Sequence, residues 1–468
     1  MSEDVSSFPA LKDDKSFVYH YVYDIELSNP NDSNFKDVYP RSVIAINKER
    51  MYTGEKFLPV TMIKLKVYKS ELGKLYDNRN DIVANVTVYQ YKYKRNGGSF
   101  KLVDGEVISS SQYACIFSDK SFPADFRRED YEAGGELSSQ SSMSNPMETL
   151  VSTITIGLLD TTGIKITKQI FNEVFASGSK AGDILQYIAC NSLANNIIID
   201  IPDHESTFGQ DIVLPVLNFA GALKYCQSVI GCYEYGLLSY YDDDTLYILN
   251  HFNTEHEFAE KETGLVHIYA SDSDKQGPAT IEASTNDDGD NFYMGSMAVD
   301  FAPKEAVNAE INGDNLIFSS FAQGIDAVSF DKDKVSASKD VAMVLKHNYG
   351  SHSSTGDKTI VDYDELNNPY NVSSKFNEIE ATGSIITVAL TNVNIIDFKP
   401  NKMVEMHFAD TRKEYDYGGT YHIISVTEMY LDSKMPPTDV DIARMQSSGK
   451  VLEQKTCAAV VTLSRKKL

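Results

Sequence analysis

Alternating apolar and polar side chains run through long stretches at both ends of the chain, and this pattern limits the fold more than any other feature. It is clearest in residues 17–27, 60–68 and 82–93, and Asn96-Gly97 follows the last run as a turn signal. Side chains in a strand point alternately to opposite faces, so alternation predicts strands with one buried and one wet face. Asn-Gly accepts the positive φ of a tight hairpin turn. We therefore predict a small antiparallel barrel or sandwich in the first 120 residues.

The end of the chain, residues 385–468, has the same strand character. Its strand-like runs are 385–390, 403–408, 420–426 and 458–463. Pro400 fixes an extended corner, and Gly418-Gly419 permits a tight turn at the start of the third run. Alternation with a glycine corner is typical of a closed β-barrel, which leaves no exposed strand edge.

The middle of the chain changes from period two to helical spacing, which predicts three helices. Their apolar positions are Ile170, Phe171, Val174 and Phe175 in the first, Ile184, Leu185, Ile188 and Leu193 in the second, and Leu217, Phe219, Leu223, Cys226 and Ile230 in the third. Ser177-Gly178 ends the first helix, Ser179 can cap the second, and the third follows Pro215 and ends at Gly231. A hairpin follows, with Asp242-Asp243-Asp244 at its tip. Beyond it, residues 315–321 are strand-like, whereas 347–369 and 433–450 are predicted to be loops. The fold class is therefore mainly β with a smaller α+β part.

Charge and motifs remove several functional classes. With 43 Lys+Arg against 67 Asp+Glu the formal net charge is −24, and gripping nucleic acid requires basic clusters that neutralise phosphates. Neither a phosphate-binding GxxxxGK[ST] loop nor a GxSxG nucleophile motif occurs. No apolar run is long enough for a membrane helix, and the N-terminal residues lack the pattern of a secretory signal.

Metal and thiol chemistry have only weak candidates. His251 and His256 have the wrong spacing for a zinc helix and are predicted to be surface histidines of a loop. The acidic residues 286–291 lack the ligand register of a calcium loop. The five cysteines form no CxxC pair and are predicted to be reduced and mostly buried, with Cys226 in the core. We predict no catalytic residue, no metal and no cofactor.

Tyrosine is abundant, with 28 Tyr and 22 Phe against no Trp. Tyrosine suits half-buried β-surfaces and interfaces, where its ring packs and its hydroxyl remains hydrogen-bonded. An AT-rich genome would produce the same bias, and composition alone leaves both explanations open.

Two blocks of sequence resemble a known family. The first consists of residues 182–188, 196–200, 214–219, 229–233, 237–241 and 247–249. The second consists of residues 394–404, 416–426 and 460–465. Together they resemble the baseplate hub proteins of contractile-tailed bacteriophages and the related base of type VI secretion spikes. The positions that carry the resemblance are Pro215, Gly231, Tyr233, Phe398, Pro400, Tyr417, Gly418, Gly419, Tyr421, Val426 and Arg465.

The resemblance implies two antiparallel β-barrel (tube-type) domains and a helix-containing middle module. The expected division is an N-terminal tube-like barrel at 1–130, a linker or surface loop at 131–149, an α+β module at 150–255, strands and long polar loops at 256–384 with a possible insertion at 271–291, and a C-terminal barrel at 385–468. The role implied is a structural virion component, the central hub of the tail baseplate, synthesised in the host cytoplasm. Such a hub is a homotrimer with the tail tube protein or a tube adaptor above, the central spike below and wedge proteins around it.

The acid excess has a possible use in such a hub. A negatively charged channel wall would repel phosphates and let DNA pass during ejection without specific binding. Two alternatives stay open at this point: a tail-associated receptor-binding protein, and a glycan-degrading enzyme hidden among the many carboxylates.

Overall fold

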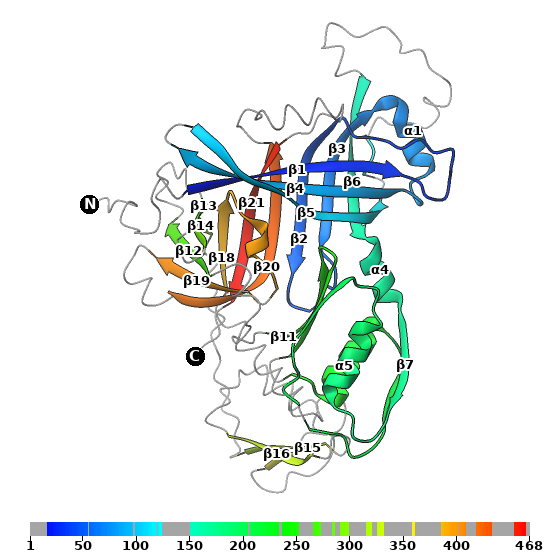
Figure 1. Ribbon diagram of the computed structural model, residues 1–468, viewed down its shortest axis with the longest axis vertical. Helices are drawn as coiled ribbons and strands as arrows, with labels where there is room; N and C mark the ends of the chain where they lie inside the picture. The colour runs from blue at the N-terminus through cyan, green and yellow to red at the C-terminus, as the bar shows by residue number, and fades with distance from the viewer. Residues whose placement is uncertain are drawn as a thin grey trace, which may run out of the picture.

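The computed structural model is mainly β, as the alternation predicts (Figure 1). It describes residues 16–54, 56–96, 99–118, 120–123, 150–204, 206–233, 236–251, 265–272, 283–285, 291–298, 315–320, 325–331, 358–360, 385–400, 402–408, 418–432 and 454–464. The predicted linker at 131–149 and the predicted loop at 433–450 lie outside these residues. No helix in the described part is long and apolar enough to cross a membrane.

The N-terminal strands confirm the predicted runs and extend several of them. They are β1 (Ser16–Ser28), β2 (Ser42–Met51), β3 (Val60–Tyr68), β4 (Val83–Asn96), β5 (Ser99–Ile116) and β6 (Val151–Asp160). A short helix that the pattern did not predict, α1 (Lys69–Asp77), follows β3 and buries only Leu72 and Leu75. Every second residue of β3 is buried, from Thr61 to Val67, which is the alternation read from the sequence.

The last third of the described chain adds the strands that complete the main sheet. These are β12 (Val266–Asp272), β13 (Ala283–Thr285), β14 (Asn291–Ala298), β18 (Ile385–Thr391), β19 (Met403–Phe408), β20 (Gly419–Asp432) and β21 (Gln454–Ser464). The four predicted runs in residues 385–468 are all strands. The stretch 271–291, which the sequence marks as a possible insertion, contains the end of β12, all of β13 and the first residue of β14.

The strand pairings of this sheet return to their starting point three times, once through a small circuit of β1, β13, β14, β18 and β21. Two larger circuits share a pair of strands. One closed circuit contains eight strands in the order β20, β2, β3, β6, β5, β4, β1 and β21, and β21 pairs with β20 again. A second circuit contains six strands in the order β12, β19, β20, β21, β18 and β14, and β14 pairs with β12 again. We call these the eight-strand circuit and the six-strand circuit. The eight-strand circuit takes its strands from both ends of the chain.

Both circuits contain the same hairpin, β20–β21. The start of β20 pairs with β19 through Gly419–His422, and its continuation pairs with β2 through residues 425–430. Strand β21 pairs with β1 at residues 454–456 and with β18 from residue 458 onward.

A β-bulge lies between Ile423 and Ser425, where β20 changes neighbours. The bulged Ile424 accepts a hydrogen bond on its carbonyl from the Tyr52 amide, 2.8 Å away. An extra residue bends and twists a strand, so the bulge lets one strand follow two circuits.

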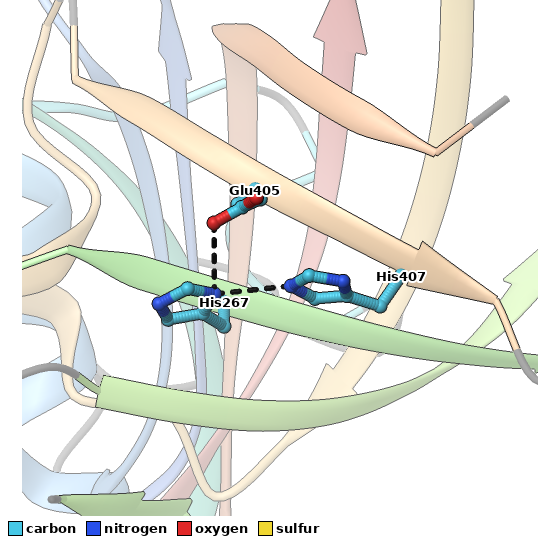
Figure 2. Close-up of side chains that lie close together, drawn as sticks. All are labelled: His267, Glu405 and His407. Atoms are coloured by element: carbon cyan, nitrogen blue, oxygen red, sulfur yellow. Dashed lines mark hydrogen bonds and ion pairs between the residues drawn. The ribbon is translucent and has the colours of Figure 1, made fainter. Parts of the chain in front are cut away.

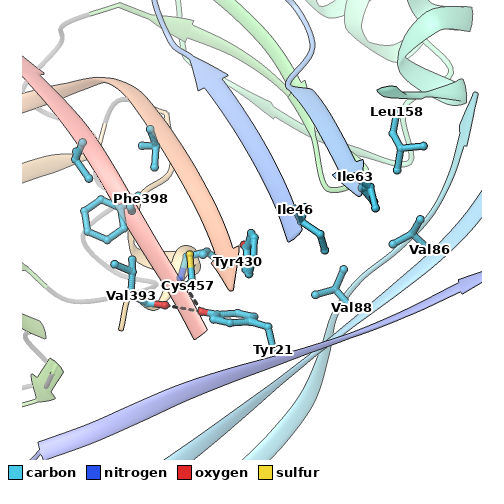
Figure 3. Close-up of a cluster of buried hydrophobic side chains, with 14 of the residues drawn as sticks. Tyr21, Ile46, Ile63, Val86, Val88, Leu158, Val393, Phe398, Tyr430 and Cys457 are labelled. Carbon is cyan, nitrogen blue, oxygen red and sulfur yellow. Dashed lines mark hydrogen bonds between the residues drawn. The ribbon is translucent and has the colours of Figure 1, made fainter. Parts of the chain in front are cut away.

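Side chains fill the inside of the eight-strand circuit (Figure 3). Ile46, Ile63 and Leu158 from β2, β3 and β6 meet Val86 from β4, and all four are almost fully buried. A cavity among these strands has a volume of about 30 Å³, and its lining includes Tyr23, Lys48 and Asp243. Such a space holds about one water molecule. The eight-strand circuit is therefore a packed core and not an open tube.

A separate α+β module with its own core lies between β6 and β12 in the chain. It contains α4 (Thr161–Lys168), β7 (Ile170–Phe175), α5 (Ala181–Cys190), β8 (Asn196–Ile199), β9 (Ile212–Asn218), α6 (Phe219–Tyr225), the π-helix η3 (Cys226–Ile230), β10 (Leu237–Asp242) and β11 (Thr245–Asn250). Ile184, Leu185 and Ile188 are fully buried on α5, as its spacing predicts. Leu193 lies beyond the end of this helix and is half exposed.

All three helix predictions need correction, the second because its N-cap is Lys180 and not Ser179 and because Leu193 lies beyond its end. The first is wrong, because residues 170–175 form strand β7, which pairs with β9. Ile170 and Val174 are exposed and only Phe171 is buried, so the apolar spacing reflects β-branched and aromatic residues in a short strand. The third helix begins at Phe219 and not after Pro215, which lies in β9. Its predicted end at Gly231 is confirmed, since this glycine has φ of +77°.

The remaining described strands are β15 (Asn315–Ser320), β16 (Ile325–Asp331) and β17 (Lys358–Ile360), which pair with one another. The prediction of a strand from Asn315 is confirmed. Strand β17 lies within the stretch 347–369 that the composition predicts as a polar loop, so that prediction is wrong for these three residues.

Candidate functional site

The predicted positions of the second sequence block gather around the shared hairpin. Phe398, Tyr421 and Val426 belong to one buried cluster that spans both circuits. Pro400 is buried in the turn before β19, and Gly418 precedes β20. Gly419 opens β20 with φ of +126°, a conformation that favours glycine. Tyr417 and Arg465 lie outside the described residues.

The predicted positions of the first block lie in the α+β module, apart from the second group. Pro215 is exposed on β9, whereas Gly231 and Tyr233 are buried. The Tyr233 hydroxyl donates a hydrogen bond to the Asp200 carbonyl, 2.8 Å away. These residues therefore build the module itself.

Tyrosine hydroxyls hold a short segment between β18 and β19, residues 393–398, against both circuits. We call it the anchored segment; it contains the 3₁₀ helix η6 (Ile395–Asp397). The Tyr21 hydroxyl donates to the Val393 carbonyl at 2.6 Å (Figure 3), and the Tyr52 hydroxyl donates to the Phe398 carbonyl at 3.0 Å. Tyr21 also accepts from the Ile395 amide at 3.2 Å. The anchored segment is not part of a strand ladder, so its buried backbone groups need such bonds, because unpaired backbone groups are costly.

Asp397 attaches the anchored segment to the six-strand circuit. Its carboxylate accepts hydrogen bonds from the Tyr293 hydroxyl and from Asn291 Nδ2, the latter at 3.1 Å. Both partners lie on β14. Burial raises the pKa of Asp397 to about 6, although these hydrogen bonds and the charges of Lys402 and Lys92 act in the opposite direction. Asp397 is thus a buried carboxyl whose pKa lies above its usual range.

A buried group of charged residues joins the α+β module to the eight-strand circuit. The tip of the β10–β11 hairpin carries Asp242 and Asp243, and β2 carries Lys48 and Arg50. Lys48 Nζ lies 2.7 Å from Asp242 Oδ1, and Arg50 Nε lies 2.6 Å from Asp242 Oδ2. Arg50 also pairs with Glu428 on β20, which is completely buried. We call these five residues the charged joint.

Neighbouring opposite charges stabilise the charged groups of the charged joint. Burial opposes the charged form of Asp243, yet Lys48, Lys399 and Arg50 hold the pKa of this carboxyl well below its usual range. Burial and the neighbouring Arg50 also oppose the Lys48 ammonium, but Asp242 and Asp243 raise its pKa. Asp243 and Asp244 both have positive φ, as a two-residue hairpin turn requires. The joint can therefore lock two parts of the molecule together.

The histidines and cysteines that the sequence singles out have mainly structural surroundings. His251 is half-buried and not a surface histidine; burial, together with the neighbouring His422, lowers its pKa to about 3. His256 lies outside the described residues. All five cysteines are free, and Cys115, Cys226, Cys232 and Cys457 are buried while Cys190 is exposed. The prediction of mostly buried thiols, with Cys226 in the core, is confirmed.

A group of three potential metal ligands was not predicted. His267 on β12 lies beside Glu405 and His407 on β19 (Figure 2). Glu405 and His407 are two residues apart in a strand, and alternate residues of a strand point to the same face. The sequence therefore indicates that these two side chains lie together. The partner His267 is 138 residues from Glu405, and no local pattern indicates that β12 and β19 pair.

Comparison with known proteins gives one family match. The family model described as Bacteriophage PBS1 gene 109 protein matches residues 138–464. None of the curated proteins matches the sequence. The matched range contains the first block of the resemblance and nearly all of the second.

Several solved structures are similar at low sequence identity. A tail protein from Neisseria meningitidis has 9% identity and a TM-score of 0.44, with 95% of this chain and 96% of that chain covered. A prophage MuSo2 tail protein from Shewanella oneidensis has 11% identity and a TM-score of 0.42, with 95% and 98% covered. A chain of the Francisella PdpA-VgrG complex has 8% identity and a TM-score of 0.42, with 98% of this chain and 54% of that chain covered.

Proposed function

The chain belongs to the family of the bacteriophage PBS1 gene 109 protein, and from this premise we propose that it is a structural hub of a phage tail baseplate. In this role it connects the sixfold tail tube to the threefold central spike. The family match agrees with the bacteriophage relationship that the two sequence blocks predict. The hub role itself rests on the geometry of the strand circuits.

The observation that carries the proposal is the pair of closed circuits joined by β20–β21. We take these circuits to be the two tube-type barrels that the resemblance implies. Three copies of a chain with two barrels present six barrels in a ring, which resolves a mismatch between sixfold and threefold symmetry. The two circuits differ in size, with eight and six strands, so the six barrels of the ring would not be identical. Their outward faces would have to be similar enough to match a sixfold tube.

The packed interior decides where a DNA channel could lie. The eight-strand circuit is filled by side chains, with a cavity of about 30 Å³, so DNA cannot pass through it. A channel would have to lie on the threefold axis between copies. Its wall would be formed by outward-facing side chains, and the net charge of −24 favours a wall that repels phosphates.

The remaining features of the proposal follow from this role. The protein would be a virion component without enzymatic activity, with tube, spike and wedge proteins as partners. The α+β module would lie outside the ring, fixed to it by the charged joint. The proposed units are the N-terminal barrel at 1–130, completed by β6 and the shared hairpin, the module at 150–255, and the C-terminal barrel at 385–468, completed by β12 and β14.

Electron microscopy of the purified full chain tests the proposal most directly. We expect trimeric rings with a central channel, and three-dimensional reconstruction should place two barrels per chain around it. A particle without a channel, or one with a basic channel wall, would contradict the hub role or the charge hypothesis respectively.

The two rival functions have their own assays. A receptor-binding protein should bind host cells when purified, and a glycan-degrading enzyme should release reducing sugar from cell-wall or capsular glycans. We expect neither activity. Among the described residues, the buried carboxylates with shifted pKa, such as Asp243 and Asp397, serve the charged joint and the anchored segment.

A further inference from the structure

Two neighbouring strands of the six-strand circuit present nitrogen and oxygen ligands on one face. Strands β12 and β19 are parallel, with His267 opposite Glu405 and Tyr269 opposite His407. The neighbours Val266, Ile268, Val404 and Met406 are fully buried, whereas His267, Glu405 and His407 are only partly covered. Period two therefore directs the three ligand side chains away from the core, toward the outside of the circuit.

The distances between the ligand atoms match those around one metal ion. His267 Nδ1 lies 3.0 Å from His407 Nε2 and 3.2 Å from Glu405 Oε2 (Figure 2). The three ligand atoms all lie within 4.8 Å of one another. With metal–ligand bonds of about 2.0–2.1 Å, neighbouring donors are separated by about 3.3 Å in a tetrahedral site and about 2.9 Å in an octahedral one. The two measured separations lie within this range.

Aromatic neighbours hold the two imidazoles in place. His267 stacks on Phe292 of β14, with ring centroids 4.8 Å apart and an angle of 9° between the planes. His407 stacks on Tyr269 with centroids 4.7 Å apart and an angle of 21°. Rings fixed in this way lose little freedom when they bind a ligand.

Solvent can reach the group from the side of Glu405. The exposed fraction of the Glu405 side chain is 37%, against 14% for His267. An ion could therefore enter without any strand opening, and water could complete its coordination. This arrangement, two imidazoles and one carboxylate with an open position, is a ligand set typical of zinc.

We propose that His267, Glu405 and His407 bind one divalent transition-metal cation of the zinc class. Two imidazole ligands disfavour Mg²⁺ and Ca²⁺, which prefer oxygen ligands. The ion would link β12 to β19, the step at which the six-strand circuit connects two strands that are far apart in sequence. It would stabilise the folded chain, since it binds the assembled pair of strands.

Zinc titration of the purified full chain, first treated with chelator, tests the site. Isothermal titration calorimetry should show one Zn²⁺ bound per chain, and saturating Zn²⁺ should raise the thermal midpoint. Glu405→Gln and His407→Gln should each weaken binding by at least about 10-fold. Glu173→Gln, an exposed carboxylate on β7, is the matched control and should leave binding unchanged.

Two further measurements separate this site from adventitious binding. Cys190→Ser removes the exposed thiol and should not alter the affinity. The absorption spectrum of the Co²⁺-substituted protein should show ligand-field bands without a thiolate charge-transfer band. The proposal is overturned if Zn²⁺ does not bind saturably, or if it binds with equal affinity to the wild type and to a folded His407→Gln variant, with folding checked by circular dichroism.

Discussion

At the residue scale, buried tyrosines act through their hydroxyl groups as well as their rings. Nine of the largest fully buried side chains are tyrosines: Tyr21, Tyr52, Tyr93, Tyr233, Tyr240, Tyr241, Tyr293, Tyr421 and Tyr430. Three of these, Tyr21, Tyr52 and Tyr293, bond to the anchored segment. Phenylalanine would fill the same space but leave these polar partners unpaired, at a cost of about 1–3 kcal/mol for each buried group.

Removing Arg50 should strongly destabilise the protein. In Arg50→Met the completely buried Glu428 loses its ionic partner, and Asp242 loses one of two. Breaking one side of a buried ion pair typically costs about 3–5 kcal/mol in free energy of unfolding. Chemical denaturation measures the loss. Lys56→Met, which breaks an exposed pair with Glu49, is the control and should cost less than about 1 kcal/mol. Equal effects of the two variants would refute the role of the charged joint.

Asp397 should make stability fall as pH rises from about 4 to about 6. Its folded pKa of about 6 lies above the unfolded value of about 3.9. The stabilising contribution of the protonated carboxyl is therefore complete below the unfolded pKa and is lost as pH rises through the folded one. The loss is at most about 3 kcal/mol.

Thermal midpoints measured across this pH range, for wild type and Asp397→Asn, check the effect. The amide cannot ionise, so the variant should lose less stability than the wild type over the interval. Parallel pH profiles would show that Asp397 does not titrate there.

At the element scale, the turn into β20 depends on the backbone conformation of one glycine. Gly419 has φ of +126°, a conformation in which an L side chain is strained. Gly419→Ala should therefore destabilise the protein by about 1–2 kcal/mol. Gly209→Ala is the control and should cost less, because Gly209 is exposed, has no positive φ and leaves an added Cβ with no atom within 4 Å. Urea unfolding distinguishes the two variants, and a larger loss for Gly209→Ala would contradict the assigned backbone conformation of Gly419.

Local patterns predicted the elements better than their partners. Alternation located β1, β3 and β19 closely, because each has one buried and one wet face. Residues 170–175 were misassigned as helix, since four apolar residues in a short strand mimic helical spacing. The pairing of His267 with Glu405 and the double use of β20–β21 depend on contacts distant in sequence, and a single sequence does not encode these in any local period.

At the scale of the whole molecule, one buried cluster extends across both circuits. It includes Ile46 and Val86 of the eight-strand circuit together with Val388 and Val404 of the six-strand circuit. Because this core is continuous, damage in the shared hairpin should affect both circuits at once.

Charge inserted into the shared hairpin should therefore abolish assembly. Ile423 and Val426 are about 2% and 1% exposed, so Ile423→Asp or Val426→Asp places a charge in the common core. Light scattering of the proposed trimer should show loss of the assembled species. Thr420→Asp, at an exposed position of the same strand, is the control and should assemble normally. A normal trimer from Ile423→Asp would show that the barrel assignment at this strand is wrong.

The shared hairpin also has a mechanical consequence. Two units joined by a linker can hinge, and two units that merely touch can slide, but here β20 and β21 both belong to both circuits. A force that separates the two circuits would therefore act on the continuous backbone of β20 and β21 and on the hydrogen bonds between these strands. The chain should therefore transmit tension and torque from one circuit to the other as a single rigid unit.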